Sequence, residues 1–133
     1  MRKISVVLMT GLLFAACQAS PANTTAPANS DPVEVVTDYL QALVHGDCAM
    51  ARALMTEDAL AFQEPFCDQP RLIGYSQLIR QPSAGNAPEV DFAMLVTIQG
   101  GGTIAPNGDH RLFVQLLVQP GGTWRVNAVD VQP

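Results

Sequence analysis

The chain has 133 residues, of which 48% are hydrophobic and 14% charged, and its formal net charge is -5. This length is enough for one domain with one hydrophobic core. Twelve acidic residues outnumber seven basic ones, so the chain lacks the basic stripe with which proteins bind nucleic acid or anionic lipid. We therefore expect no nucleic-acid partner and no membrane attachment through surface charge.

Residues 1–16 have the pattern of a secretory signal peptide. Arg2 and Lys3 precede an apolar run from Ile4 to Phe14, and small residues follow the run. The run is shorter than the about 20 apolar residues that span a bilayer as a helix. Loss of this segment leaves five arginines against twelve acidic residues, a formal charge of -7. We expect export to an extracytoplasmic space and no transmembrane anchor.

The sequence LFAAC at 13–17 resembles the bacterial lipobox, in which two small residues precede a cysteine that receives diacylglycerol. The resemblance implies that Cys17 is lipidated, becomes the first mature residue and anchors the protein to a membrane of the bacterial cell envelope. Cleavage after Ala16 or Ala19, with Cys17 unmodified, is the alternative. Residues 17–30 are small, polar or proline, a composition typical of a flexible tether.

Helices are predicted from Asp31 onwards. Asp31 can cap a first helix with Pro32 in its first position, and Gly46 offers a left-handed end. Asp47 and Thr56 can cap a second and a third helix, the third running up to Pro65. The first helix has an apolar stripe at three- and four-residue intervals, made by Val33, Val36, Leu40 and Leu43.

Two further cysteines, Cys48 and Cys67, fall in the predicted exported domain. In an oxidising compartment such a pair is typically bonded, and both residues flank one helical hairpin. A metal site or a reactive thiol is the competing interpretation, but neither a CxxC spacing nor paired histidines accompany them. We predict a disulfide between Cys48 and Cys67.

The second half of the chain predicts strands at 71–80, 89–99, 111–119 and 123–131. The first, with a bulge at Gly74, has a short helix as its alternative. The other three alternate between apolar and polar residues, and in the last one Trp124, Val126 and Ala128 share the apolar side. This period indicates an antiparallel sheet covered on one side. We predict an α+β fold, with N-terminal helices packed on one face of a curved antiparallel sheet of about four strands.

Two segments resemble the nuclear transport factor 2-like superfamily. YLQALVHGDCAMARALMTEDA at 39–59 is similar to its first helices, and GTWRVNAVDV at 122–131 is similar to its last strand. The resemblance implies a domain over residues 31–133 of the small secreted lipoprotein branch. It also implies a cone between sheet and helices, in which enzymes of the superfamily hold an acid or a histidine.

The residues that can do such chemistry are Asp38, Tyr39, Tyr75, Asp91 and His110. The strand phase puts Asp91 on the polar side of its strand, where we expect it to be solvated or paired with Arg111 or Arg125. We expect His110 at the exposed rim and the two tyrosine hydroxyls in water.

A bulge alters this phase. If one lies at Gly74 or near Val129, it can turn Asp91 or Asp130 inward. Both acids therefore stay on the list of candidates.

Three functional hypotheses remain open. The first is a non-catalytic, envelope-tethered module that binds a small ligand or a protein through the cone mouth or the outer sheet face. The second is an isomerase-like or hydrolase-like enzyme that uses Asp91 or His110 in the cone. The third is a homodimer that buries Leu95, Phe113 and Leu117 of the outer sheet face. The sequence contains no GxSxG, phosphate-loop or HExxH motif, and we expect no cofactor and no metal.

Overall fold

A computed structural model describes residues 24–63, 66–67, 69–82, 88–101 and 106–132. The predicted signal peptide and Cys17 lie outside these ranges. The described chain has three helices followed by four strands: α1 (Pro32–His45), α2 (Cys48–Ala53), α3 (Glu57–Phe62), β1 (Arg71–Gln81), β2 (Glu89–Gln99), β3 (Gly108–Val118) and β4 (Trp124–Gln132). The α+β prediction is confirmed, and the segment at 71–80 is a strand rather than a helix.

The three helices begin where the sequence predicts and α1 ends as predicted, whereas α3 ends at Phe62, before the predicted end near Pro65. The Asp31 side chain accepts a hydrogen bond from the Val33 amide, and Gly46 ends α1 in the left-handed conformation at φ 72°. The side chains of Asp47 and Thr56 cap α2 and α3 in the same way. Each cap satisfies an amide that the helix itself leaves without a partner.

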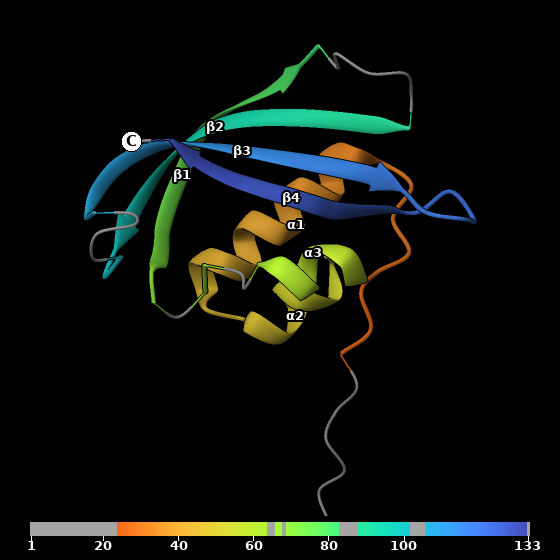
Figure 1. Cartoon of the computed structure of the whole chain (residues 1–133), viewed down its shortest axis with the longest axis horizontal. Helices are drawn as coiled ribbons and strands as arrows, with labels where there is room; N and C mark the ends of the chain where they lie inside the picture. Colours follow the sequence, from red (N-terminus) through yellow and green to blue (C-terminus); the bar gives the residue numbers. More distant parts are fainter. Residues whose placement is uncertain (1–23, 64–65, 68, 83–87, 102–105, 133) are drawn as a thin grey trace, which may run out of the picture.

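The strands form one antiparallel sheet in the order β1-β2-β3-β4. The sheet curves over the helices, with α1 nearest to it and α2 below α1 (Figure 1). We call the side that packs on the helices the inner face and the opposite side the outer face. Alternate residues of β2 and β3 fill the inner face and are at most 3% exposed: Val90, Phe92, Met94, Val96, Ile98, Leu112, Val114 and Leu116.

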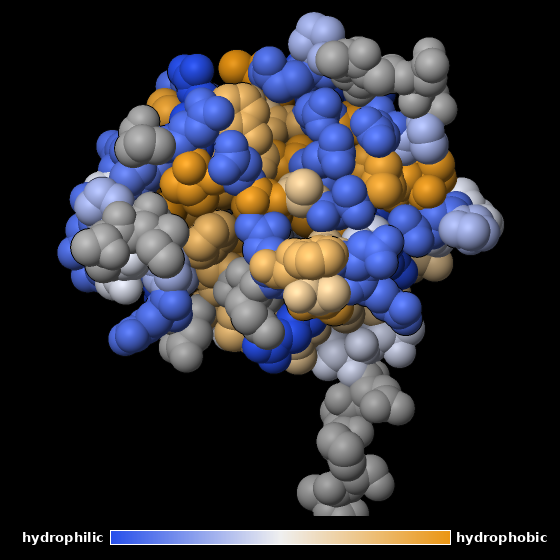
Figure 2. Space-filling view, viewed as in Figure 1, coloured by the Kyte–Doolittle hydropathy of each residue, from blue (hydrophilic) through white to orange (hydrophobic). Residues whose placement is uncertain are grey.

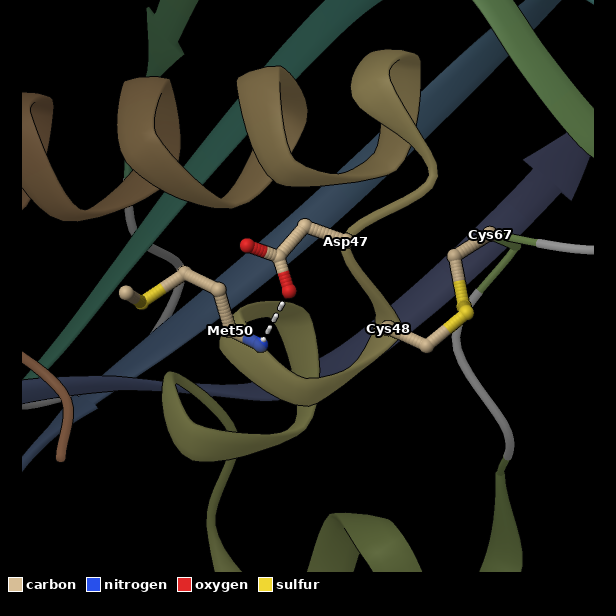
Figure 3. The surroundings of a disulfide bond; sticks show 4 residues. All are labelled: Asp47, Cys48, Met50 and Cys67. Carbon is tan, nitrogen blue, oxygen red and sulfur yellow. Dashed lines mark hydrogen bonds between the residues drawn. A yellow bond between two sulfur atoms is a disulfide. The ribbon is translucent and has the colours of Figure 1, made fainter. Parts of the chain in front are cut away.

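The disulfide between Cys48 and Cys67 is present, as predicted. It joins the start of α2 to the segment that leads into β1 (Figure 3). Next to it Asp47 accepts a hydrogen bond from the Met50 amide at 3.0 Å. A disulfide is typical of proteins in an oxidising, extracytoplasmic compartment. Among the residues that the structure describes, no helix is both long and apolar enough to cross a membrane.

The open edge of β4 is covered by the chain between α2 and the end of α3. The Val126 amide donates to the Leu54 carbonyl at 2.9 Å, and the Thr56 amide donates to the Val126 carbonyl at 2.8 Å. Three residues further along β4, the Gln63 side chain donates to the Val129 carbonyl at 2.6 Å and accepts from the Val129 amide at 3.1 Å. The outward backbone groups of Val126 and Val129 are thus hydrogen-bonded within the domain.

The predicted tether contacts the domain at its end. The Trp124 amide donates to the Asn29 carbonyl at 3.2 Å, and Ala26 packs against the core. Residues 24–30 form neither helix nor strand. The chain just before Asp31 therefore lies against the start of β4.

Bulges alter the pairing in two strands. The register of β1 shifts between Leu72 and Gly74, as predicted, and again between Ser76 and Ile79. In β4, Gln115 of β3 pairs with Ala128 while Leu116 pairs with Val126, so Asn127 has no partner across the ladder. Such an extra residue reverses the side on which the following residues point.

Candidate functional site

The inner side of the sheet is filled with side chains. Between α1 and the sheet lie the largest fully buried residues, among them Tyr39, Leu40, Leu43, Phe92 and Met94. Asp91 and Asp130 both belong to the outer face, because the neighbours of Asp91 are buried, and of those of Asp130 one is buried and the other is partly buried against the core. The structure therefore places no candidate carboxylate of the strands among the apolar residues under the helices.

Tyr39 differs from expectation. Its side chain is 0% exposed, and its hydroxyl has no hydrogen-bond partner among the described residues. Burial raises the pKa of Tyr39 well above its ordinary value, because the charged phenolate is poorly solvated there. The prediction that this hydroxyl reaches water was wrong, since Tyr39 lies on the face of α1 that the sheet covers.

His110 also differs from expectation, because β3 begins at Gly108, three residues before the predicted start. In this longer strand His110 has the phase of Leu112 and Val114 and is only 7% exposed. Its Nε2 lies 2.5 Å from the Pro106 carbonyl, which only accepts, so Nε2 carries the proton. Nδ1 has no partner among the described residues. The prediction of an exposed rim residue was wrong.

The remaining sequence candidates lie apart from one another. Asp38 lines a hollow of about 350 Å³ near the end of α1, together with His45 and Asp47. His45 there contacts the Gln41 carbonyl through Nδ1 at 2.7 Å. Tyr75 in β1 is partly buried against the core. The structure thus brings none of these residues together with Asp91 or His110 in one of the hollows described here.

The outer face carries the arrangement that best suits a ligand. A hollow of about 340 Å³ lies over β2, β3 and β4, and we call it the acidic hollow. It is lined by Gln81, Asp91, Phe113, Val114, Gln115, Ala128 and Asp130. Its volume lies within the range of small-molecule sites. Figure 2 shows apolar and polar residues mixed over the strands in the upper part of the molecule.

The register explains where the two carboxylates stand. Asp91 pairs with Gln115, and Asp130 pairs with Phe113, so the two acids approach the hollow from strands on opposite sides of β3. Two strand spacings of about 4.8 Å separate β2 from β4, which is roughly 10 Å across the sheet. On β3, between the two acids, stand Gln115 and Phe113, and the small side chain of Ala128 lies next to Asp130 on β4.

Asp91 is half-buried and does not pair with the arginines that the sequence suggested. Arg111 pairs with Leu95, four residues along β2, and Arg125 pairs with Leu117 on the far side of β3. Within the described ranges neither Asp91 nor Asp130 has a hydrogen bond or an ion pair. The acidic hollow therefore holds two carboxylates whose charge is not balanced by a neighbouring cation.

The bulge at Asn127 creates this arrangement. Without it, Ala128 and Asp130 would share the inner phase of Val126, as the sequence alternation predicted for Ala128. Instead Ala128 is exposed, Val129 is 8% exposed under the sheet, and Asp130 points outward. The expected inner position of Ala128 was therefore wrong.

Side chains hold the bulge in place. Thr56 donates to the Asn127 side-chain carbonyl at 3.1 Å, and the Asn127 amide donates to the Gln115 side-chain carbonyl at 3.1 Å. This chain of hydrogen bonds runs from the start of α3 to a residue that lines the acidic hollow. Thr56 itself is 9% exposed, so its hydroxyl is shielded from competing water.

Two other hollows differ from the acidic hollow in charge. One of about 170 Å³ adjoins the acidic hollow across Phe113 and is lined by Arg111, Leu95 and Ile79 among others. Another, of about 460 Å³ at the start of α3, is lined both by Arg125 and by the acids Glu57 and Asp58. The acidic hollow differs from both, because it is lined by two acids and no basic residue.

Sequence reasoning found part of this site. Asp91 and Asp130 were candidate acids and Phe113 was a candidate dimer contact. Gln81, Gln115 and Ala128 were missed as residues of a site. The polar phase of β3 carries Gln115 to the outer face, but only the register shows that it stands beside Asp91. In the part of the chain that is described, no three metal-ligating side chains come together.

No protein-family model, no curated protein and no solved structure matches this chain.

Proposed function

We propose that this protein is a non-catalytic binding module, exported and tethered to the bacterial cell envelope, and that it binds a small ligand at the outer face of its sheet. The observation that carries the proposal is the contrast between the two sides of the sheet. The inner side is filled with apolar residues, whereas the outer side has an open hollow with two unpaired carboxylates and an aromatic ring.

The same contrast weighs against the enzyme alternative. A catalytic carboxylate is tuned by apolar surroundings that exclude water, and Asp91 and Asp130 lie on the open outer face instead. His110 is buried, but one of its ring nitrogens is engaged by a backbone carbonyl. An isomerase or hydrolase built on these residues would need a substrate pocket around them.

Mapping of bound ligands tests the binding role. The full chain, labelled with nitrogen-15 and extracted in neutral detergent, is titrated with a set of small cations, anions and neutral aromatics. We expect amide shifts to concentrate on the outward residues of β2, β3 and β4. Shifts confined to α1 and the inner face, or turnover of an ester or ketone substrate that depends on His110, would replace the proposal with the enzyme alternative.

The envelope attachment is part of the proposal and rests on the LFAAC sequence at 13–17 and on the disulfide, which fits export. We also propose that the domain belongs to the nuclear transport factor 2-like superfamily, to which its order of helices and strands is similar. Mass spectrometry of the membrane fraction should find Cys17 as a lipid-modified N-terminal residue. With Cys17→Ser the protein should appear in the soluble fraction, and a wild-type chain that starts at Ser20 would contradict the anchor.

A homodimer is the second candidate, because three apolar residues of the outer face, Leu95, Phe113 and Leu117, are only partly buried in the single chain. Face-to-face contact of two sheets would bury them. The measurement is the solution mass at several protein concentrations. A stable dimer that Phe113→Asp dissociates would support this second candidate and would close the hollow to small ligands.

A further inference from the structure

The ligand of the acidic hollow follows from the chemistry of its lining, and this inference rests on the proposed binding role. We propose that the hollow binds a short aliphatic diammonium ion, with one ammonium group at Asp91, the other at Asp130, and the methylene chain crossing β3 over Phe113.

The charge of the lining selects a cation. Asp91 and Asp130 are the ionisable residues of the hollow, and neither is paired within the described part of the chain. The whole chain is also acidic, with a formal charge of -5, which favours the approach of cations over anions. A metal ion fits poorly, because the two acids stand on strands that β3 separates and, among the described residues, no third metal-ligating side chain joins them.

The separation of the acids selects a cation with two charges. The two acids stand on β2 and β4, two strand spacings apart across the sheet and two residues apart along it, so their Cα atoms are roughly 12 Å apart. One ammonium group cannot contact both at hydrogen-bond distance, whereas two ammonium groups on a short chain can each meet one. A primary ammonium has three donors and a carboxylate accepts several hydrogen bonds.

The middle of the hollow suits the methylene chain. Phe113, between the acids, and Ala128, next to Asp130, provide apolar surface in the hollow, on which a hydrocarbon chain loses contact with water. The ring of Phe113 also attracts a cation that lies over its face. On the other side of Phe113, Arg111 lines the adjoining hollow, and its positive charge disfavours a diammonium ion there.

The bulge at Asn127 gives this site a support that can be tested separately. Asn127 links Thr56 to Gln115 and keeps Ala128 and Asp130 on the outer face. It is a positioning residue, because it holds the strand that carries Asp130 rather than lining the acidic hollow itself.

The test is calorimetric titration of the full chain, extracted in neutral detergent, with diaminopentane carrying its amines at the two chain ends. Diaminopropane and pentylamine are the comparison ligands, since one is too short and the other has one charge. We expect diaminopentane to bind at least about fivefold more tightly than either, and sodium chloride to weaken it, because both charge pairs are partly exposed. Equal affinity for pentylamine would overturn the two-point arrangement.

Variants locate the site. Asp91→Asn and Asp130→Asn should each weaken diaminopentane about fivefold or more and remove its advantage over pentylamine. The matched control is Asp38→Asn, which neutralises a carboxylate that lines another hollow and should leave binding unchanged. Equal losses in all three variants would reveal attraction to the net charge alone and would overturn the proposal. Asn127→Ala should weaken binding while the folded protein keeps its hydrogen-exchange protection in β2.

The neutral aromatic benzyl alcohol separates the failure of this inference from that of the proposed function. Amide shifts around Phe113 with benzyl alcohol but none with diaminopentane would overturn the diammonium ligand and leave the outer-face binding role standing. Shifts at the outer face with neither compound would overturn both.

Discussion

The inner and outer faces of the sheet differ in burial and in the residue types that they carry. On the inner face, successive inward residues of β2 and β3 are apolar and almost completely buried. On the outer face, the residues that alternate with them include Asp91, Leu95, Phe113 and Gln115, all of them only partly buried. The inner residues are selected by packing against the helices, whereas on the outer face water permits charge, aromatic surface and small side chains next to one another.

The contrast identifies where function can lie in so small a domain. A core that fills the space under the sheet gives stability but leaves no room for a ligand there. The hollow arises instead on the outer face, where Ala128 provides little bulk beside Phe113. The site and the core therefore share the same strands while depending on opposite sides of them.

The largest expected effect comes from two neighbouring leucines of β3. Leu116 is 0% exposed on the inner face, and Leu117 is partly buried on the outer face. Leu116→Ala should lower the free energy of unfolding by about 2 to 5 kcal/mol through lost contacts and a cavity. Leu117→Ala should cost about 1 kcal/mol or less. Urea denaturation of both variants measures the difference, and similar losses would contradict the division between the faces.

Loss of the disulfide is expected to have the next largest effect on stability, because this bond links the helices to the segment before β1. Replacement of Cys48 and Cys67 by alanine should lower the free energy of unfolding by about 3 kcal/mol, since the unfolded chain regains the freedom that the closed loop removes. Comparison with Cys17→Ala, in which the pair stays intact, provides the control for loss of a cysteine. An unchanged denaturation midpoint in the double variant would show that the helix layer needs no such link.

A smaller effect is expected where the helices meet the edge of β4. Gln63→Ala removes two hydrogen bonds to the backbone of Val129 and should cost about 1 to 2 kcal/mol. The β4 amides should also exchange faster with solvent deuterium. Gln99→Ala, at an exposed position on β2, is the matched control and should change neither quantity.

The smallest effect at neutral pH is that of Tyr39→Phe. The hydroxyl has no partner among the described residues, so its removal should leave the protein equally stable or stabilise it by about 1 kcal/mol.

The same variant predicts a pH dependence. Because burial raises the pKa of Tyr39, the unfolded chain loses the phenol proton at a lower pH than the folded protein does. The free energy of unfolding is therefore unaffected by this group below the ordinary tyrosine pKa of about 10 and falls as the pH rises above it. Denaturation measured from about pH 9 to about pH 11, around that ordinary pKa, should show a steeper loss of stability for wild type than for Tyr39→Phe. Parallel curves would mean that the hydroxyl reaches water in solution.

Local signals determined much of this fold. Asp31, Asp47 and Thr56 start the three helices and Gly46 ends the first, because capping depends on a few neighbouring residues. Alternation fixed the inner residues of β2 and β3 for the same reason, since a strand repeats every two residues. The disulfide between Cys48 and Cys67 was also predictable, because the predicted domain contains no other cysteine.

The tertiary structure alone decided the candidate site. The position of Asp130 depends on whether β4 carries an extra residue, and Asn127 is held there by Thr56, which is 71 positions away in the sequence. The place of Asp91 beside Gln115 depends on the register between β2 and β3. The buried state of Tyr39 and His110 likewise depends on which elements lie against them. Periodicity describes one strand at a time, whereas register, bulges and packing are set by the elements that meet it, so the sequence by itself determined the elements and the structure determined which side chains share a hollow.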